Sequence, residues 1–519
     1  MRRHDSRTAA GRGRGSRASR RRQPASAARL DPLRQAATPG PAKSGVLISA
    51  ASSSVTAKPD FVGGPPLSIV ILAAGEGKRM RSALPKVLQP LAGRPLLQHV
   101  IDTARSLAPS AIHVVYGHGG ERVRSALGNA PVSWTLQDEQ LGTGHALLQA
   151  MPQLPDDHRV LVLYGDVPLI RRETLAQLAE LGGTSSLGLL TARFEEPQGY
   201  GRIVRNARGL VQRIVEQKDA TAKQLAIREC NTGVLVAPAR RLRGWLGRLT
   251  AANSQGEYYL TDVIAMAVKE RVAVRALLAA DASEVLGVND RAQLAQLEGA
   301  WRARRARELL LAGVTLADPA RVDVRGTLSH GSDVFVDVNV VFEGRVALGD
   351  RVHIGAGCVV RDSEIGADTQ LHPHCVIEGA VIGAGCSIGP FARLRPTATL
   401  AAEVHIGNFV EVKNSQLGAG SKANHLAYVG DAAVGERVNI GAGTIVANYD
   451  GAMKHHTTIG DDVHTGSNSV LVAPIIVGAG ATIAAGSTVT NSVPAGKLTV
   501  ARAPQATVEG WQRPVKPAK

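Results

Sequence analysis

Residues 348–389, LGDRVHIGAGCVVRDSEIGADTQLHPHCVIEGAVIGAGCSIG, contain an aliphatic residue followed by glycine at a regular spacing. The same pair recurs from Leu348 to Val477 in steps of six residues, multiples of six, or one residue more or less. Such hexapeptide repeats predict a parallel β-helix, in which the aliphatic side chain points inward and a small residue turns each corner. The region is long enough for roughly 10 coils of about 18 residues, each rising about 4.8 Å.

Polar residues concentrate where this repeat is interrupted. The step of 19 residues from Ile440 to Ile459 contains VANYDGAMKHH, and KANHLAY precedes Val429. A β-helix can serve only as an oligomerisation rod, but polar interruptions are typical of loops that carry a site.

Upstream of the repeats, residues 67–181 alternate between predicted strands and helices. The segments are LSIVILAAG (67–75), PLLQHVIDTARSL (95–107), IHVVYGH (112–118), VSWTLQ (132–137), GHALLQAMP (144–152), VLVLYGDVP (160–168) and ETLAQLAEL (173–181). This alternation predicts a Rossmann-like α/β domain, a mostly parallel sheet with helices on both faces. Ligands of such sheets bind at the carboxyl ends of the strands.

The chain therefore divides into regions of different character. We predict a disordered basic extension at 1–66, the α/β domain at 67–290, a helical linker at 291–314, a left-handed β-helix at 315–500 and a tail at 501–519. The linker contains Leu294, Leu297 and Trp301 at helical spacing. We interpret its arginine run as a solvated helix face rather than a nucleic-acid contact.

The net charge of +16 suggests a nucleic-acid partner until its distribution is considered. Residues 1–66 hold 13 of the 60 Lys and Arg residues but only 3 of the 44 acidic residues. An organelle transit peptide, a nucleic-acid tail and an extension without function all fit this composition, and we favour the last. Since only 3% of the residues are aromatic, nucleic acid is not expected as a partner.

Membrane insertion and cysteine chemistry are not expected either. The sequence contains no run that approaches the ~20 apolar residues of a membrane helix, so we predict a cytoplasmic protein without a membrane partner. The cysteines form no C-x-x-C pair and are predicted to be small buried thiols: Cys230, Cys358, Cys375 and Cys386.

The first predicted strand ends in LAAGEGKRM (72–80), which is a candidate phosphate loop. Met80 replaces the third glycine of a G-x-G-x-x-G pattern, and G-K-[ST] is absent from the segment. Its glycines would still let backbone N–H groups approach an anion, while Arg79 and Lys86 add positive charge. From these residues alone, a structural strand-to-helix turn remains an alternative.

Asp166 follows the strand VLVLY at the same predicted edge of the sheet. A carboxylate in this place either caps a helix or binds Mg²⁺, the metal that accompanies nucleotide phosphates.

Motifs along this half resemble one enzyme family. LAAGEGKRM with Pro85-Lys86, LQDEQLGTGHA, YGDVP, YGRI, VEQKDA, CNTG, GEYYLTD and GVND are similar to the first domain of the bifunctional N-acetylglucosamine-1-phosphate uridyltransferase/glucosamine-1-phosphate acetyltransferase family. The resemblance continues to the C-terminus. One departure is Lys78, where the family usually has Thr.

The resemblance implies that UTP and N-acetylglucosamine 1-phosphate react on this domain and release pyrophosphate. Arg79 and Lys86 would stabilise charge on the phosphates, and Asp166 and Asn289 would hold Mg²⁺. The implied contacts to UTP and UDP-N-acetylglucosamine are Leu72, Ala73, Ala74, Gly75, Lys86, Gln137, Gly142, Thr143, Tyr164, Gly165, Asp166, Gly201, Glu216, Asn231 and Asn289. Of these, Gly201, Glu216 and Asn231 match the positions on the sugar side.

The second half is similar to the acetyltransferase domain of the same family through GPFARLRP, NFVEVKNS, KANHLAYVGD, NIGAGT, NYDGAMK, GSN and ARAPQ. The resemblance implies a homotrimer with acetyl-transfer sites between neighbouring subunits, and acetyl-CoA and glucosamine 1-phosphate as substrates. His425 would be the general base, and Glu411 would orient it. The implied sugar-phosphate contacts are Arg395, Lys413, Tyr428, Asn439 and Lys454. The implied acetyl-CoA contacts are Ala442, Asn448, Tyr449, Ser467, Ala485 and Arg502.

Two other functions remain as alternatives to this bifunctional enzyme. One is a monofunctional sugar nucleotidyltransferase whose β-helix only assembles subunits, against which His425, Tyr449 and Arg502 argue. The other is a nucleic-acid-binding protein that acts through its basic extension.

Overall fold

The computed structural model of the chain describes residues 65–75, 77–117 and 120–516. The prediction for the N-terminal extension falls almost entirely outside these ranges, as do Glu76 of the candidate phosphate loop and the last three residues. In the part of the chain that the structure describes, we find no helix long and apolar enough to cross a membrane.

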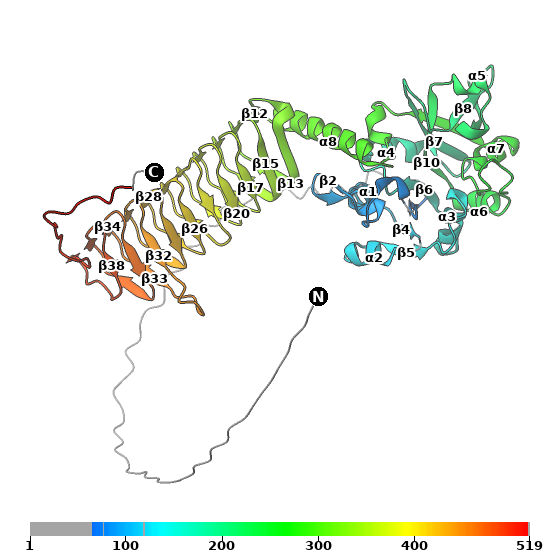
Figure 1. Cartoon of the computed structure of the whole chain (residues 1–519). Coiled ribbons are helices and arrows are strands. Elements are labelled where there is room, and N and C mark those ends of the chain that lie inside the picture. The colour runs from blue at the N-terminus through cyan, green and yellow to red at the C-terminus, as the bar shows by residue number, and fades with distance from the viewer. Residues whose placement is uncertain (1–64, 76, 118–119, 517–519) are drawn as a thin grey trace, which may run out of the picture. The chain divides into compact units, whose positions relative to one another are not determined.

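The first folded region is the predicted, mostly parallel sheet (Figure 1). Its strands are β1 (Leu67–Ala73), β4 (Ala111–Tyr116), β5 (Ser133–Leu136), β6 (Arg159–Tyr164), β7 (Ser186–Arg193), β8 (Arg202–Arg205), β9 (Val211–Val215), β10 (Glu229–Pro238) and β11 (Ala273–Leu278). They follow the order β11-β7-β10-β6-β1-β4-β5, and β8 and β9 extend from β10. β1 is parallel to β4 and β6, whereas β10 is antiparallel to β6 and β7.

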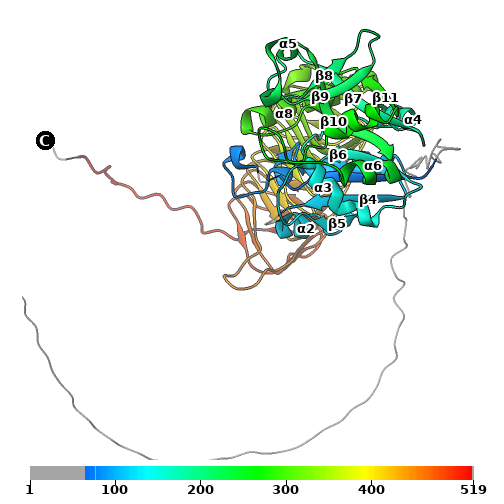
Figure 2. The ribbon, with the colours of Figure 1, turned by 90° about the vertical axis from the view of Figure 1, so that its right-hand side faces the viewer.

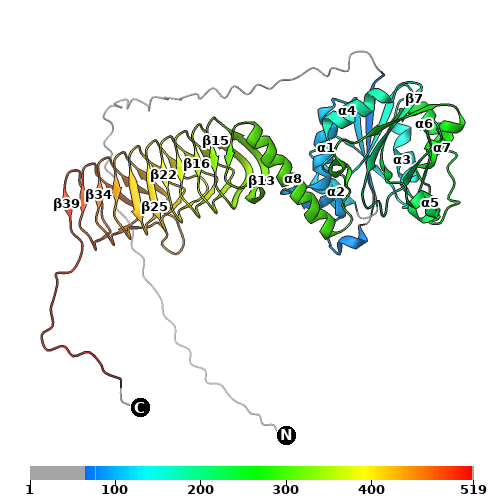
Figure 3. The ribbon, with the colours of Figure 1, turned by 90° about the horizontal axis from the view of Figure 1, so that it is seen from above.

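Helices cover both faces of this sheet, as predicted (Figures 2 and 3). They are α1 (Leu96–Ser106), α2 (Glu121–Ala126), α3 (Thr143–Ala150), α4 (Arg172–Leu181), α5 (Ala222–Leu225), α6 (Ala239–Leu246) and α7 (Asp262–Lys269). Ile69 and Ile71 of β1 pack with α1, α2 and α4, while Val70 and Leu72 pack with α3, α6 and α7. The strand is therefore apolar throughout because both of its faces are buried.

The predicted linker helix is α8 (Arg291–Leu311), and the Asp290 side chain caps it by accepting a hydrogen bond from the Gln293 N–H. The interpretation of its arginine run, Arg302, Arg304, Arg305 and Arg307, as a solvated face holds for Arg307, which is exposed, whereas the other three are half-buried. Arg304 is half-buried, lies 5.1 Å from the Trp301 ring and donates to the Leu169 carbonyl. Arg302 pairs with Asp323. A helical pattern shows which residues share a face but not which carbonyls and carboxylates that face will meet.

The repeat region forms the predicted left-handed parallel β-helix. Its larger sheet contains β13 (Val322–His330), β15 (Val340–Leu348), β17 (Val359–Arg361), β18 (Glu364–Ile365), β20 (Val376–Glu378), β21 (Val381–Ile382), β23 (Arg393–Leu394), β24 (Thr399–Leu400), β26 (Glu411–Lys413), β27 (Gln416–Leu417), β29 (Tyr428–Gly430), β30 (Ala432–Val434), β32 (Ile445–Ala447), β33 (Thr457–Ile459), β35 (Val470–Val472), β36 (Ile475–Val477) and β38 (Thr488–Val489). The other sheet contains β12 (Thr315–Leu316), β14 (Phe335–Val336), β16 (His353–Ile354), β19 (Gln370–Leu371), β22 (Ser387–Ile388), β25 (His405–Asn408), β28 (Lys422–His425), β31 (Asn439–Ile440), β34 (His464–Thr465), β37 (Thr482–Ile483) and β39 (Leu498–Thr499). A separate ribbon pairs β2 (Pro90–Leu91) with β3 (Arg94–Pro95).

Successive coils stack in strict register. Val359 pairs with Val376, one coil later, and Ala432 pairs with Thr457 across the longest coil. That coil contains the predicted polar interruption, so the extra residues leave the β-helix and return to it. The boundaries between the five regions, predicted at 1–66, 67–290, 291–314, 315–500 and 501–519, stay a prediction.

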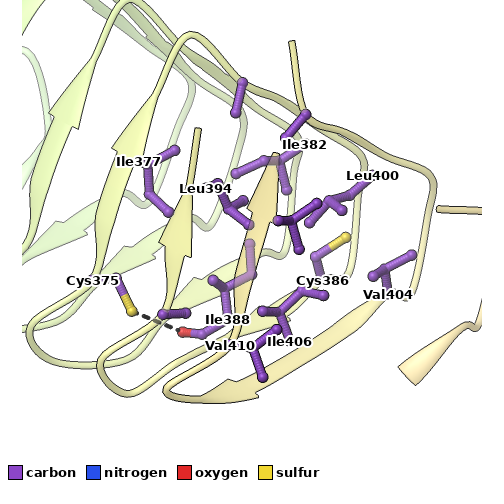
Figure 4. Close-up of a cluster of buried hydrophobic side chains, with 14 of the residues drawn as sticks. Cys375, Ile377, Ile382, Cys386, Ile388, Leu394, Leu400, Val404, Ile406 and Val410 are labelled. Carbon is purple, nitrogen blue, oxygen red and sulfur yellow. Dashed lines mark hydrogen bonds between the residues drawn. The ribbon is translucent and has the colours of Figure 1, made fainter. Parts of the chain in front are cut away.

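Aliphatic side chains and thiols fill the interior of the coils (Figure 4). Ile388 is fully buried, as the repeat predicts, and so are Ile377 and Leu394, which no glycine follows. The prediction of small buried thiols is confirmed for all four cysteines. Cys375 donates a long hydrogen bond of 3.5 Å to the Ile388 carbonyl.

The coils turn at three corners, where a single residue with positive φ recurs in each column. The charged corner includes Arg351, Asp368, Arg437 and Asp462. The aromatic corner consists of His374, Phe391, Phe409 and Leu426, with the Phe391 and Phe409 rings 5.3 Å apart. The amide corner consists of Thr397, Asn414 and Asp431. The named residues are charged at the first corner, aromatic or aliphatic at the second, and polar at the third.

Because each coil contributes a full layer to the core, deleting interior methyl groups should destabilise the β-helix. We expect Ile377→Ala to lower the free energy of unfolding by about 3 kcal/mol, measured by urea denaturation. Val381→Ala, at a position that is 50% exposed, is the control and should change it by less than about 0.5 kcal/mol. Equal losses in the two variants would contradict the inward assignment of Ile377.

Candidate active sites

The predicted nucleotide residues converge on one cavity of about 330 Å³ at the carboxyl ends of β1 and β6. Of the predicted residues, Leu72, Ala73, Ala74, Gly75, Lys86, Gln137, Gly142, Thr143, Tyr164 and Asp166 line it. Gly165 lies behind them, where its N–H donates to the Leu72 carbonyl. The cavity thus lies where the ligands of parallel sheets bind.

A charge pair stands at one side of the cavity. Lys86 Nζ donates to Asp166 Oδ2 at 2.5 Å, and both side chains are mostly buried. Gly77 has a positive φ, and a Cβ at this position would come within 2.6 Å of the Lys86 Cβ. Glycine is therefore required for the loop to lie against Lys86 and fix its direction.

Asp166 also holds the segment that contains Asn289. Its backbone carbonyl accepts a hydrogen bond from the Val288 N–H at 3.0 Å. A carboxylate and an amide oxygen are ligand types that suit a divalent metal, which can take its other ligands from phosphates and water. That Asp166 and Asn289 hold such a metal stays a prediction. Since the described residues contain no cluster of three or more His, Cys, Asp or Glu suited to a metal ion, such a metal would depend on substrate oxygens.

Arg79 takes a different position from Lys86. It lies in a short 3-10 turn, Lys78–Met80, where its side chain is exposed and does not line the cavity. The structure therefore places Lys86 beside the cavity but leaves Arg79 at the surface of the loop.

The predicted sugar-side residues form a second group next to this cavity. The Asn231 N–H donates to the Gly201 carbonyl at 2.8 Å, and a Cβ at Gly201 would lie 3.1 Å from Glu216 Oε1. The Thr261 hydroxyl donates to the same Glu216 oxygen. Burial raises the pKa of Glu216, although the hydrogen bond from Thr261 opposes the shift.

Tyr164 connects the two groups. It lines the cavity, and its ring lies so close to Gly233 that a Cβ there would come within 2.3 Å. Burial first, and then the charges of Glu216 and Asp166, raise the pKa of Tyr164. The phenol therefore stays protonated and can donate a hydrogen bond at neutral pH.

Sequence reasoning missed two polar residues that line the cavity, Gln140 and Glu257. Gln140 donates from Nε2 to the Ala74 carbonyl at 2.6 Å and so holds the end of the candidate phosphate loop. Both residues belong to motifs quoted above, LQDEQLGTGHA and GEYYLTD. The quoted motifs contain both residues, but the sequence of a loop does not show whether a polar side chain points into a cavity.

In the β-helix, His425 lies at the end of β28, directly before Leu426 of the aromatic corner. Its side chain is exposed, and Nδ1 is 3.0 Å from Asn408 Oδ1. When Nδ1 donates to that amide oxygen, Nε2 carries the lone pair that a general base needs.

The expectation that Glu411 orients His425 is not met within the chain. Glu411 accepts a hydrogen bond from Arg395 at 3.0 Å, while the partner of His425 is Asn408. The physical reason is register: β28 pairs with β25, which places Asn408 opposite His425, whereas Glu411 begins β26 in the other sheet.

A column of alternating charges runs along the larger sheet and ends at the predicted phosphate cations. Arg325 pairs with Glu343 at 3.0 Å, and Arg361 pairs with Glu343 and Glu378. The column continues through Arg395 to Lys413, so two cations follow each other in register. A phosphate requires positive charge, and the binding of a phosphate by Arg395 and Lys413 stays a prediction.

Tyr428, Lys413 and Asn448 gather around a carboxylate that was not predicted, Asp431. Lys413 Nζ lies 3.7 Å from Asp431 Oδ2, and Asn448 donates to the same oxygen. Asn448 Nδ2 is also 3.5 Å from the Tyr428 hydroxyl. Asn448, which was grouped with acetyl-CoA contacts, thus lies among the predicted sugar-phosphate contacts.

The other predicted acetyl-CoA residues form a column of turns. Arg502 donates to the Ala485 carbonyl at 2.7 Å, the Ser467 carbonyl accepts from the Gly486 N–H, and the Ala442 carbonyl accepts from the Asn468 N–H. Tyr449 and Lys454 lie instead on the hairpin that the interruption forms, where they pair as an antiparallel bridge. Asn439 is half-buried in β31, in register with Lys422 and His464.

The predicted acetyl-transfer residues are therefore divided within one chain. His425 belongs to the aromatic corner, whereas Lys413 and its neighbours belong to the amide corner. The structure does not bring these two groups together in a single subunit.

The sheet with its nucleotide-type cavity and the hexapeptide β-helix define a transferase with two different transferase domains. Residues 69–310 match the MobA-like NTP transferase domain, residues 324–406 the GMPPB C-terminal domain and residues 456–491 the bacterial transferase hexapeptide (six repeats).

The curated relatives identify the family. The chain is 59% identical over 453 residues to the bifunctional protein GlmU of Ralstonia nicotianae, which covers 87% of this chain and 100% of the relative. It is 59% identical over 450 residues to that of Azoarcus sp., and 56% identical over 452 residues to that of Stenotrophomonas maltophilia, with 87% of this chain covered in both cases. The chain belongs to the GlmU family of bifunctional proteins.

The Glu216 carboxylate should lower the free energy of unfolding at neutral pH, because burial raises its folded-state pKa above the ordinary value of 4.5. Well below pH 4.5 the carboxyl is neutral in both states, and the penalty grows as the pH rises from the unfolded-state pKa to the folded-state pKa, above which it is constant. We expect Glu216→Gln to unfold at a higher temperature than the wild type at pH 7.5, and this advantage should disappear at pH 4.5. Thermal unfolding at both pH values measures the difference, and an advantage that does not depend on pH would contradict the assignment.

Proposed function

We propose that the chain is a bifunctional enzyme of UDP-N-acetylglucosamine synthesis. The β-helix, predicted at 315–500, transfers acetyl from acetyl-CoA to glucosamine 1-phosphate. The sheet domain, predicted at 67–290, then transfers uridylyl from UTP to N-acetylglucosamine 1-phosphate and releases pyrophosphate. The observation that carries this proposal is membership of the family over the full length of its relatives. The cavity in the first domain and the cation pair in the second supply the matching chemistry.

In the first domain, the phosphate oxygen of the sugar attacks the α-phosphorus of UTP, and pyrophosphate leaves. Lys86 stabilises the charge on the phosphates from the side of the cavity, and Arg79 does so from the exposed loop. Asp166 and Asn289 would hold Mg²⁺, which when bound neutralises charge on the transferring phosphates. Glu216, Asn231 and Gly201 would bind the sugar.

In the β-helix, His425 Nε2 removes a proton from the glucosamine amine, which attacks the acetyl-CoA thioester and displaces the CoA thiolate. Asn408 keeps the proton of the imidazole on Nδ1 and so leaves Nε2 free to act as the base. Arg395 and Lys413 would bind the phosphate of the sugar.

We propose a homotrimer in the cytoplasm, with acetyl-transfer sites between subunits. Two observations support the assembly. Phe391, Phe409 and Leu426 form an apolar ridge on the aromatic corner, and their exposed fractions are 48%, 55% and 60%. An apolar ridge of this length on a monomer usually marks an interface. The base and the phosphate cations also belong to different corners, which a neighbouring subunit could bring together.

The two activities should be separable because their residues belong to different domains. We expect His425→Ala to lower acetyl transfer by about 100-fold or more and to leave uridylyl transfer unchanged. Asp166→Asn should lower uridylyl transfer by a similar factor and leave acetyl transfer unchanged. Thiol release and pyrophosphate release measure the two steps.

Absence of thiol release by the wild type would favour a monofunctional nucleotidyltransferase with an assembling β-helix. If either folded variant lost both activities, two independent sites would be contradicted.

Sites shared between subunits predict complementation between two inactive variants. We expect His425→Ala and Lys413→Ala homotrimers to lack acetyl transfer. In trimers assembled from equal amounts of both chains, roughly a quarter of the interfaces would combine an intact His425 with an intact Lys413. About that fraction of wild-type thiol release should return. A mixed preparation that forms trimers but stays inactive would mean that both residues act from the same chain.

A further inference from the structure

Asp431 occupies an unusual place for a carboxylate. It lies among the lysines proposed to bind a phosphate, where a negative charge should weaken binding of that anion. It is only 8% exposed, and burying a carboxylate is costly unless hydrogen bonds and cations compensate. Its partners therefore indicate what it does.

The side chain of Asp431 is held from both neighbouring coils. From the preceding coil, Asn414 Nδ2 donates to Oδ1 at 2.6 Å, and Asn414 is itself held by the Thr397 hydroxyl. From the following coil, Asn448 Nδ2 donates to Oδ2. Lys413, the residue before Asn414 in the preceding coil, places its Nζ 3.7 Å from the same oxygen. Each carboxylate oxygen thus has a fixed partner.

The backbone of Asp431 contributes to the same arrangement. Its carbonyl accepts a hydrogen bond from the Thr457 N–H at 3.1 Å. Asn448 is the last residue before the chain leaves the coil, and Thr457 is the residue at which the chain returns in β33. Asp431 therefore binds both ends of the 449–456 hairpin, which carries Tyr449 and Lys454.

We propose that Asp431 is the positioning residue of the acetyl-transfer site: it holds Lys413 and Asn448 in place and closes the base of the hairpin that carries Tyr449 and Lys454. This inference rests on the proposed function, in which those residues bind the two substrates. Asp431 itself binds neither substrate and acts only through its neighbours.

Electrostatics agree with this role. Although burial alone would raise the pKa of Asp431, the hydrogen bonds from Asn414 and Asn448 and the charges of Lys413 and Lys454 lower it. The carboxylate is therefore ionised at every pH at which the enzyme would work. Its charge offsets the repulsion that two lysines would otherwise experience before a phosphate arrives.

The test is the steady-state kinetics of Asp431→Asn in the full chain. This variant keeps the shape of the side chain but loses its charge and one acceptor. We expect KM for glucosamine 1-phosphate and for acetyl-CoA to rise about tenfold or more, because the binding groups lose their fixed geometry. The pH profile of kcat should stay unchanged, since His425 lies on another corner. Hydrogen exchange of the amides at 449–456 should become faster.

Two further variants make the test specific. Asp368→Asn is the matched control because Asp368 also has a positive φ and pairs with a basic side chain, Arg351, but lies on the charged corner. It should change neither KM nor hydrogen exchange.

Asn414→Ala removes one hydrogen bond to Asp431 without touching a lysine, and it should raise both KM values by a smaller factor. Loss of uridylyl transfer in Asp431→Asn would show that this variant does not fold. In that event, the KM values of Asn414→Ala test the proposal instead.

The proposal is overturned if a folded Asp431→Asn keeps both KM values within twofold of the wild type. It is also overturned if KM for glucosamine 1-phosphate falls, since Asp431 would then only oppose the phosphate. A Lys413→Ala variant separates this failure from a failure of the proposed function. If Lys413→Ala leaves KM for glucosamine 1-phosphate unchanged, the phosphate site itself is misplaced.

Discussion

Each coil of the β-helix must return the chain to the register of the coil before it, and the second half of the molecule depends on this constraint. Parallel pairing carries every backbone group of one coil onto the next, so each corner column keeps a single conformation over many coils. Side chains of neighbouring coils then meet at the spacing of a coil. Aromatic rings stack on one corner, ion pairs form on another, and hydrogen bonds join a hydroxyl, an amide and a carboxylate on the third.

The same constraint arranges the charged side chains of the larger sheet. From Arg325 to Glu378 each charge pairs with its neighbour in the next coil, and Arg395 pairs with Glu411. At Lys413 the alternation stops, and the nearest acid, Asp431, comes from the next coil at the adjacent corner. Lys413 is thus paired with a carboxylate outside the ladder, while the ladder below it stays intact.

Much of this architecture could be predicted from periodicity, because inward-pointing aliphatic residues such as Ile354 and Ile388 repeat at the period of the fold. Glycine-rich loops at strand ends likewise located the cavity beside Lys86 and Asp166. Contacts across coils could not be predicted: Asn408 rather than Glu411 bonds to His425, and Asp431 is nothing more than one acid among 44 in the sequence. Arg304 shows the same limit, since the carbonyl to which it donates, that of Leu169, lies far away in the chain.

The coil that carries the hairpin has a further consequence. Ala432 pairs with Thr457 as though the intervening residues formed an ordinary coil, so the length of the excursion is decoupled from the geometry of the rod. Residues can be gained, lost or exchanged between 449 and 456 without a shift in any strand beyond them. In a scaffold of this kind the coils fix the positions of the strands, and the sequence of an excursion can change with the substrate without moving them.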